Sequence, residues 1–252
     1  MLGLGNTLSG GIVPAVDAFD SYSLIFDGTD EYVDLDDAAS VMSGAAGSFS
    51  IWVKYDDAVT GDSFKYSIQF YTDSENYIHM GLRQSTQDYA VVAHEAGDTY
   101  KQSKFAIDED WDGDPRAWHH VIATWSDATG DDELIVYVDG SQSLVQINTV
   151  TGLGTFSGTP VNMRLGHSMI YGTSNYEMEG NINDVAIFND VLTEAEAIAI
   201  YNEGTPKDES SHSGLVGYWK FEENAGTTVA DSSSYSNTGT LVNGTSFDSD
   251  TP

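Results

Sequence analysis

Short stretches in which apolar and polar residues alternate with a period of two dominate the chain. In residues 48–55, for example, Phe49, Ile51, Val53 and Tyr55 fall on one side of the pattern. Successive side chains of a β-strand point to opposite faces, so this alternation is typical of a strand with one buried face. Similar stretches occur at residues 22–26, 64–71, 77–82, 89–93, 118–125, 134–138, 161–165, 182–188 and 215–221.

Turn signals separate these stretches. Glycine stands beside aspartate or asparagine at residues 27–28, 61–62, 130–131, 139–140 and 180–181. Such pairs favour tight turns, because glycine tolerates the backbone conformations that a hairpin needs. Many short strands at hairpin-like spacing predict an antiparallel β-sandwich or a barrel.

One segment has the pattern of a helix. Thr193 and Glu196 have the spacing of a capping box at its start. Ile198 and Tyr201 then follow at helical spacing, and Gly204 lies where the pattern stops. The sequence therefore predicts an all-β protein with one short helix.

The charge of the chain excludes several classes of partner. Nine Lys and Arg residues stand against 40 Asp and Glu residues, which gives a formal net charge of −31. Nucleic-acid binding depends on basic residues that neutralise phosphates, so no nucleic-acid partner is expected. Docking on anionic membranes is disfavoured for the same reason, whereas cation binding and a salty environment are favoured. The absence of cysteine excludes disulfides, thiolate metal sites and thiol nucleophiles.

The first residues lack the basic and apolar regions of a secretory signal peptide, and we expect none. No uninterrupted apolar run reaches the length needed to span a bilayer, so membrane insertion is not expected.

Several motifs follow one another in a recognisable order. They are LIFDGTDEYV at residues 24–33, FSIWVK at 49–54, WHHV at 118–121, LIVYVDG at 134–140, LG at 165–166 and GNINDVAIFN at 180–189. Together with the helix that follows them, they resemble LamG-like domains of the concanavalin A-like lectin/glucanase superfamily. The resemblance implies an antiparallel β-sandwich jelly roll of the concanavalin A-like type.

The motifs divide the chain into four parts. Residues 1–20 form an N-terminal arm, residues 21–205 the jelly roll, residues 206–213 a polar linker or loop, and residues 214–252 a C-terminal segment. This last segment resembles the beginning of such a domain, although here it follows the domain. An isolated hairpin carrying Tyr218, Trp219 and Phe221 would expose much apolar surface. We therefore expect its strands to complete the sandwich, or that of a neighbouring subunit.

No catalytic constellation is evident. Hydrolysis of a glycosidic bond needs two carboxylates that face the bond. The resemblance implies that hydrolases of this fold carry a Glu-x-Asp-x-x-Glu strand, which the sequence lacks. Ser168 follows Gly166 but lacks the second glycine of a nucleophile elbow, and no Glu-x-x-His follows His120. We therefore expect a protein that is not an enzyme.

Calcium is the one cofactor that the sequence suggests, because this ion takes oxygen ligands from carboxylates, carbonyls and water. The resemblance implies a structural calcium near the sandwich edge, with a second candidate ligand set in the C-terminal segment. An alternative acidic loop copies the first half of an EF-hand but has His119 at the twelfth position, so an acidic hairpin tip is the competing interpretation. The three sets are Asp27, Asp30 and Asp184; Glu222, Asp231 and Asn237; and Asp108, Asp110 and Asp112.

Two further groups of residues are candidates for binding. Sugars stack their apolar faces on exposed aromatic rings, for which Trp111, Tyr171 and Tyr176 are the candidates. The N-terminal arm is apolar and glycine-rich, and a segment of this kind usually packs against a partner. Its candidate docking residues are Leu2, Leu4, Leu8, Ile12 and Val13.

Two functions follow as hypotheses. The first is a non-catalytic structural or interaction module on the surface of a virion or other extracellular particle, as a capsid decoration or a tail- or fibre-associated protein. Its arm would dock on a protein partner or on further copies of the chain. The alternative is a carbohydrate-binding module or adhesin with calcium-assisted glycan recognition.

Overall fold

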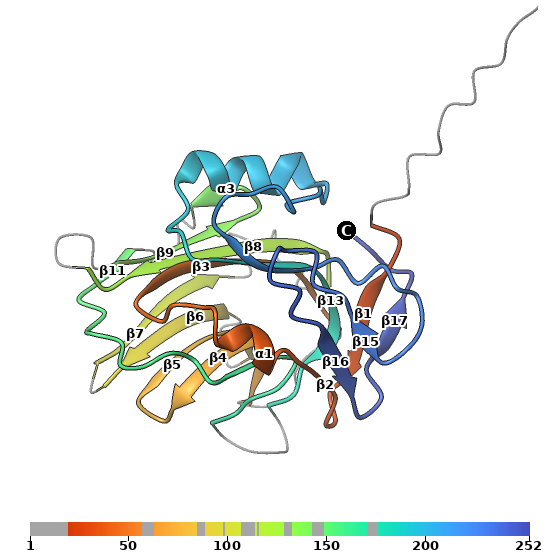
Figure 1. The fold of residues 1–252 in the computed structure, drawn as a ribbon, viewed down its shortest axis with the longest axis horizontal. Helices are drawn as coiled ribbons and strands as arrows, with labels where there is room; N and C mark the ends of the chain where they lie inside the picture. Colours follow the sequence, from red (N-terminus) through yellow and green to blue (C-terminus); the bar gives the residue numbers. More distant parts are fainter. Residues whose placement is uncertain are drawn as a thin grey trace, which may run out of the picture.

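The computed structural model describes residues 20–56, 63–84, 89–97, 99–106, 114, 116–128, 133–142, 149–170 and 176–252. These residues form two antiparallel sheets that pack face to face, with one helix lying over the outside of the first sheet (Figure 1). The predicted antiparallel β-sandwich is confirmed.

The first sheet is built around β3, the strand with the clearest alternation in the sequence. Its order is β10 (Ser141–Gln142), β9 (Glu133–Val138), β8 (His119–Ser126), β3 (Ala46–Tyr55), β13 (Glu179–Phe188), β1 (Ser23–Asp27) and β17 (Ser246–Asp248). Two further strands join it: β11 (Thr149–Thr151) pairs with β9, and β14 (Leu215–Trp219) pairs with β13.

The second sheet combines strands from distant parts of the chain. Its order is β15 (Thr228–Val229), β16 (Gly239–Val242), β2 (Tyr32–Asp34), β12 (Asn162–Leu165), β4 (Ser63–Asp73), β5 (Asn76–Gln84), β6 (Tyr89–Ala96) and β7 (Thr99–Ala106).

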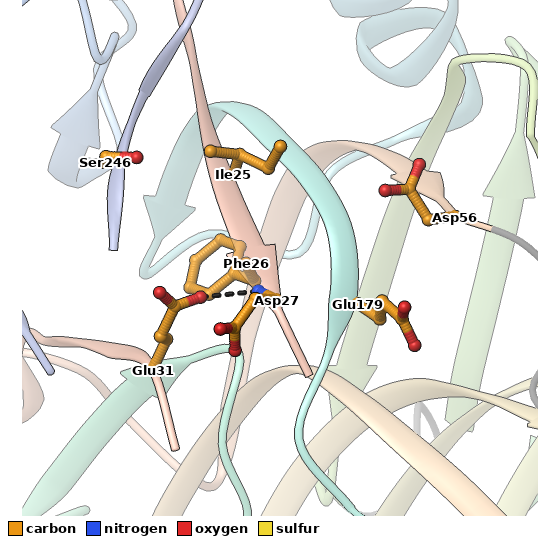
Figure 2. Close-up of a pocket in the computed structure, with 7 residues that line it drawn as sticks. All are labelled: Ile25, Phe26, Asp27, Glu31, Asp56, Glu179 and Ser246. Atoms are coloured by element: carbon orange, nitrogen blue, oxygen red, sulfur yellow. Dashed lines mark hydrogen bonds between the residues drawn. The ribbon is translucent and has the colours of Figure 1, made fainter. Parts of the chain in front are cut away.

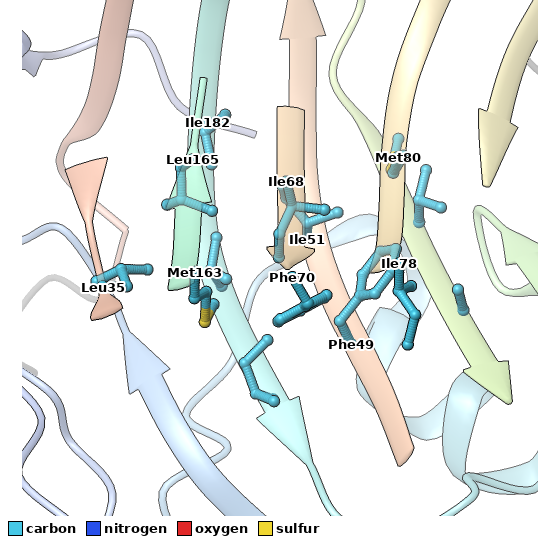
Figure 3. Packing of buried hydrophobic residues seen from close by; sticks show 14 of the residues in the cluster. Leu35, Phe49, Ile51, Ile68, Phe70, Ile78, Met80, Met163, Leu165 and Ile182 are labelled. Carbon is cyan, nitrogen blue, oxygen red and sulfur yellow. The ribbon is translucent and has the colours of Figure 1, made fainter. Parts of the chain in front are cut away.

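The core fills the space between the two sheets (Figure 3). The ring of Phe49 on β3 lies 6.0 Å from that of Phe70 on β4 and 6.3 Å from that of Trp125 on β8, measured between ring centroids. All three side chains are fully buried. Aromatic pairs at this separation pack favourably beyond the area that they remove from water. The predicted apolar face of β3 is therefore the face that holds the sheets together.

The other face of β3 is buried as well, which the alternation did not predict. Helix α3 (Glu194–Tyr201) lies over it and begins at the predicted capping box of Thr193 and Glu196. Ala197 and Ile200 of the helix belong to a second, smaller apolar cluster on this side of the sheet. The ring of Tyr201 stacks on Trp52 of β3 at 5.9 Å. Two short elements, α1 (Asp36–Ala39) and the 3₁₀ turn η1 (Asn202–Gly204), were not predicted.

The C-terminal segment adds strands to both sheets of its own chain. β14 pairs with β13, β16 pairs with β2, and β17 pairs with β1. The side chains of Tyr218, Trp219 and Phe221 are fully buried. Asp231 fixes the segment, because its carboxylate accepts hydrogen bonds from the backbone N–H groups of Tyr218, Ser233 and Asn237 at 2.7–2.9 Å.

The carboxyl group of Asp184 on β13, next to this segment, is buried and accepts fewer hydrogen bonds than that of Asp231. Asp184 lies at an irregularity in the pairing of β13 with β3, has a φ of 49°, and accepts a hydrogen bond of 2.6 Å from the Tyr218 hydroxyl. Burial raises the pKa of Asp184 to about 8 and the pKa of the nearby Asp20 to about 6. Burial therefore shifts both groups towards the protonated form, and Asp184 keeps its proton to the higher pH.

This burial predicts a dependence of stability on pH. A carboxyl group whose pKa is raised on folding binds its proton more tightly in the folded state than in the unfolded state. The contribution of Asp184 to the free energy of unfolding is therefore complete below about pH 4 and is lost as the pH rises through about 8. Asparagine keeps the acceptor for Tyr218 and tolerates positive φ. We expect Asp184→Asn to raise the free energy of unfolding at about pH 8 by about 1–3 kcal/mol.

Urea unfolding at about pH 5 and about pH 8 measures this effect. The gain from Asp184→Asn should shrink towards the lower pH. The matched control is Asp37→Asn, which removes the same charge from an exposed position. Parallel pH profiles for the wild type and Asp184→Asn would contradict the prediction.

Candidate functional site

A pocket of about 320 Å³ opens where β1 ends and where β13 and β17 begin (Figure 2). This volume lies within the range of small-molecule sites. Four carboxylate side chains and few apolar groups line it: the residues are Ile25, Phe26, Asp27, Glu31, Asp56, Glu179 and Ser246.

The predicted turn after β1 positions these carboxylates. Asp27 lies opposite Glu179 in the pairing of β1 with β13. The Asp27 carboxylate accepts a hydrogen bond of 2.9 Å from the N–H of Thr29, while its own N–H donates to Glu31. Burial, together with the nearby carboxylates of Asp27 and Asp30, raises the pKa of Glu31. The pocket therefore offers hydrogen-bond acceptors and negative potential.

The structure does not bring the first predicted calcium set together. Asp27 and Asp30 flank the turn after β1, but Asp184 follows Glu179 by five residues along β13. At about 3.3 Å per residue, this places Asp184 roughly 16 Å along the strand from the partner of Asp27. Its carboxylate is also buried against Tyr218. The structure therefore separates Asp184 from Asp27 and Asp30, because the turn after β1 and the irregularity of β13 lie at different places along the strand pair.

The second predicted set supports the backbone of the chain instead. Asp231 receives the hydrogen bonds described above, and Glu222 Oε1 accepts from the N–H groups of Ser21 and Tyr22 at 2.8 and 3.2 Å. The backbone carbonyl of Asn237 accepts a hydrogen bond of 3.0 Å from Trp219 Nε1. In the part of the chain that the structure describes, no three His, Asp or Glu side chains form a group that could hold a metal ion. These two sets therefore do not fit a calcium ion.

Three of the predicted groups fall outside the described residues. They are the alternative calcium loop of Asp108, Asp110 and Asp112; the aromatic candidates Trp111 and Tyr171; and the docking residues Leu2, Leu4, Leu8, Ile12 and Val13. No helix among the described residues is long and apolar enough to cross a membrane.

A second candidate site lies on the outer face of the second sheet. The strand register places Asp34 of β2, Arg164 of β12, Gln69 of β4 and His79 of β5 next to one another across four strands. We call these four residues the polar row. Their chain neighbours, such as Leu165, belong to the core between the sheets. Side chains alternate along a strand, so the polar row points to the opposite face.

Two side chains of the polar row are buried with hydrogen-bonding atoms left over. Gln69 Oε1 accepts a hydrogen bond of 2.5 Å from the N–H of Met169, and its Nε2 has no partner among the described residues. His79 Nδ1 likewise has none in this part of the chain. Burial lowers the pKa of His79 to about 3, so its ring is neutral. Buried polar groups usually find a partner in proteins, and those without one call for an explanation.

Aromatic rings surround His79. The centroids of Phe64, Tyr66 and Tyr77 lie 5.4, 4.9 and 5.5 Å from that of His79. Tyr176, which the sequence suggested for ligand binding, is half-buried beside this group, with its ring 6.3 Å from that of Tyr66. The structure therefore brings Tyr176 to the same face as the polar row.

The other end of the polar row carries a charged group on a ring. The guanidinium carbon of Arg164 lies 4.4 Å from the ring centroid of Tyr32. The ring of His167 lies 5.3 Å from the same Tyr32 ring, and its Nδ1 is 3.0 Å from Oε1 of the fully buried Glu177. Burial lowers the pKa of His167, although the Glu177 carboxylate opposes this shift.

Sequence reasoning missed the polar row. Each of its residues occupies the polar side of an alternating strand, where a solvated side chain is the ordinary interpretation. The sequence gives no register between strands that lie far apart in the chain, so it could not bring the four residues together. A weak signal was present, because His79 and Gln69 interrupt strands that are otherwise rich in apolar residues.

Solved structures share this fold at low sequence identity. A candidate carbohydrate-binding protein from Bacteroides ovatus aligns with a TM-score of 0.59 and 17% identity over 92% of this chain. The chain spans 60% of the length of that protein. The CBM40 of a Ruminococcus gnavus IT-sialidase aligns with a TM-score of 0.54 and 16% identity over 72% of this chain and 97% of its own.

Domain 4 of AbnA, an extracellular arabinanase from Geobacillus stearothermophilus, was solved in complex with arabinotriose. It aligns with a TM-score of 0.52 and 16% identity over 71% of this chain and 76% of its own. At these identities the likenesses show the fold. No curated protein matches the sequence.

A family model of the laminin G type, described as the concanavalin A-like lectin/glucanases superfamily, matches residues 27–198. The match runs from the last residue of β1 through β13 and includes most of helix α3, and it covers most of the motifs of the sequence. Because it covers more than half of the chain, the protein belongs to the concanavalin A-like lectin/glucanases superfamily.

Proposed function

We propose that this protein is a carbohydrate-binding module and that the outer face of the second sheet binds the glycan. The observation that carries the proposal is the polar row, in which hydrogen-bonding atoms without partners lie among aromatic rings. A sugar presents apolar C–H faces to rings and hydroxyl groups to polar side chains, so it suits such a surface.

The solved structures with the same fold support this proposal. Two of them are modules or domains of sugar-processing enzymes, and one of these was solved with a bound oligosaccharide. Identities near 16% show only that the fold is shared. A binding site therefore has to be inferred from the residues of this chain. The side chains of Tyr32 and Arg164 support this inference, because both are partly exposed at the open end of the polar row.

The first prediction from this proposal concerns Tyr32. We expect the wild type to retain a subset of glycans on an array, and we expect Tyr32→Ala to weaken that binding about three- to tenfold, because a ring–sugar contact is lost. Titration calorimetry with the best glycan measures the change. Tyr235→Ala is the matched control, since Tyr235 is an exposed tyrosine outside the polar row.

Two results would count against this site. A wild type that binds no glycan refutes the proposed function. Equal losses in Tyr32→Ala and Tyr235→Ala would show that the glycan binds elsewhere, and the acidic pocket would be the next place to test.

We further propose that binding occurs without turnover. The nearest approach to an acid–base pair is Glu31 beside Asp27 in the pocket, where the pKa of Glu31 is raised. The carboxylate of Glu31 is held by the backbone N–H of Asp27, which leaves it poorly placed to protonate a sugar oxygen. Incubation with a panel of polysaccharides should release no reducing ends. Cleavage that is abolished by Glu31→Gln would contradict this expectation.

Calcium binding remains a prediction from the sequence. An ion that binds only the folded state stabilises it by mass action. The melting temperature should therefore be higher with calcium than with a chelator, and Asp110→Asn should reduce the difference if the acidic loop holds the ion. A melting temperature that does not respond to either reagent would contradict calcium binding.

The role on the surface of a virion or other extracellular particle is a separate proposal. It depends on the N-terminal arm docking on a protein partner, and the arm lies outside the described residues. The carbohydrate-binding proposal does not depend on it.

A further inference from the structure

We infer that Arg164 selects acidic sugars by binding their carboxylate. This inference rests on the proposed carbohydrate-binding function and adds the class of ligand. Arg164 lies at the open end of the polar row, where its side chain is partly exposed.

Arg164 differs from four other described basic residues of this chain in having no carboxylate partner. With 40 acidic residues against nine basic ones, a basic side chain finds a carboxylate easily. Lys54, Arg116, Lys207 and Lys220 all do so, with partners within 4.0 Å. Arg164 has no such partner among the described residues, and its Nε is buried without a hydrogen-bond acceptor.

No carboxylate forms an ion pair with Arg164 among the described residues. Asp34 lies opposite Arg164 in the pairing of β2 with β12, and its Oδ1 accepts a hydrogen bond of 3.0 Å from the N–H of Asp36. Glu177 is fully buried beside His167. The guanidinium group is therefore not held in an ion pair by a described side chain.

A second donor without an acceptor stands next to Arg164. Gln69 is its direct neighbour across β12 and β4, and direct cross-strand neighbours have Cβ atoms about 5 Å apart. The hydrogen bond from Met169 fixes the carbonyl end of the Gln69 amide, so the unpaired atom is the donor Nε2. Gln69 is fully buried. Arg164 Nε and Gln69 Nε2 are thus two adjacent buried donors without an acceptor among the described residues. The exposed part of the Arg164 guanidinium is the donor that a ligand with acceptor oxygens would meet.

The ring of Tyr32 determines which side of the guanidinium is left for a ligand. The guanidinium carbon lies over the Tyr32 ring, 4.4 Å from its centroid, in a cation–π contact. The N–H donors of arginine point outward in the plane, at its edge. A carboxylate binds arginine at this edge through two parallel hydrogen bonds, and such charged bonds are stronger than bonds to a neutral hydroxyl.

The net charge of the chain opposes the binding of acidic ligands at other places on its surface. Its acidic surface repels anions in general, and at about 0.15 M salt this repulsion is screened beyond about 8 Å. An acidic sugar is therefore held only where a donor lies within direct contact. The acidic pocket at the ends of β1 and β13 offers the opposite environment and would repel the same carboxylate.

The test compares an acidic oligosaccharide with its carboxyl-reduced form. A glucuronic-acid oligosaccharide and a sialylated oligosaccharide serve as probes, each beside its neutral counterpart, in titration calorimetry at about 0.15 M salt. We expect the wild type to bind at least one acidic form about tenfold or more tightly than its reduced form. Arg164→Met should abolish this preference, and Arg164→Lys should keep only part of it.

Arg116→Met is the matched control, because it removes the same charge from an exposed residue that already pairs with Asp114. It should leave the preference intact. Equal binding of the acidic and reduced forms would overturn the role of Arg164 and leave the proposed function standing. Absence of binding to these probes and to every glycan of an array would overturn both. If Arg116→Met lost the preference for the acidic form as fully as Arg164→Met, the preference would depend on net charge alone, and the inference would also be overturned.

Discussion

The register between β4 and its two neighbours, β12 and β5, is the constraint on which the rest of the structure depends. Pairing Gln69 with Arg164 and His79 fixes which side chains of three strands point into the sandwich. The same register buries Ile68 and Phe70 against the first sheet. A slip of one residue would exchange the two faces of a strand, so the apolar core and the polar row specify each other.

Two carboxyl groups, the half-buried Asp231 and the buried Asp184, show how the C-terminal segment combines stability with sensitivity to pH. Asp231 accepts hydrogen bonds from three backbone N–H groups and the Ser233 hydroxyl where the chain turns back after β14. Asp184 accepts a hydrogen bond from the Tyr218 hydroxyl of β14, and burial raises its pKa to about 8. Desolvation favours the neutral form of Asp184. The segment is thus anchored by one carboxylate, and it covers another carboxyl group that prefers to keep its proton.

The sequence was a good guide to what depends on local pattern. The alternation in residues 48–55 predicted the inner face of β3, and Thr193 with Glu196 predicted the start of helix α3, because strand faces and capping boxes are set by nearby residues. The site depends instead on contacts between distant segments. Arg164 and Gln69 become neighbours only through the sheet, and Asp184 proved remote from Asp27 although their motifs suggested one ligand set. Side-chain burial was equally hidden, since polar residues such as Gln69 and His79 have the sequence pattern of a solvated face.

The two candidate ligand surfaces have opposite electrostatic character, and this difference separates their chemistry. The pocket beside β1 collects acceptors, because Asp27, Glu31 and Glu179 approach one another across the strand pair and its turn. The open end of the polar row collects donors, because Arg164 and Gln69 lie side by side without acceptors. A neutral sugar could hydrogen-bond to either surface, since a hydroxyl group both donates and accepts. A carboxylate accepts only, so its desolvation is compensated at the donors and penalised at the pocket. If the proposal holds, Arg164, which has no carboxylate partner among the described residues, is the feature that separates the two surfaces for an acidic ligand.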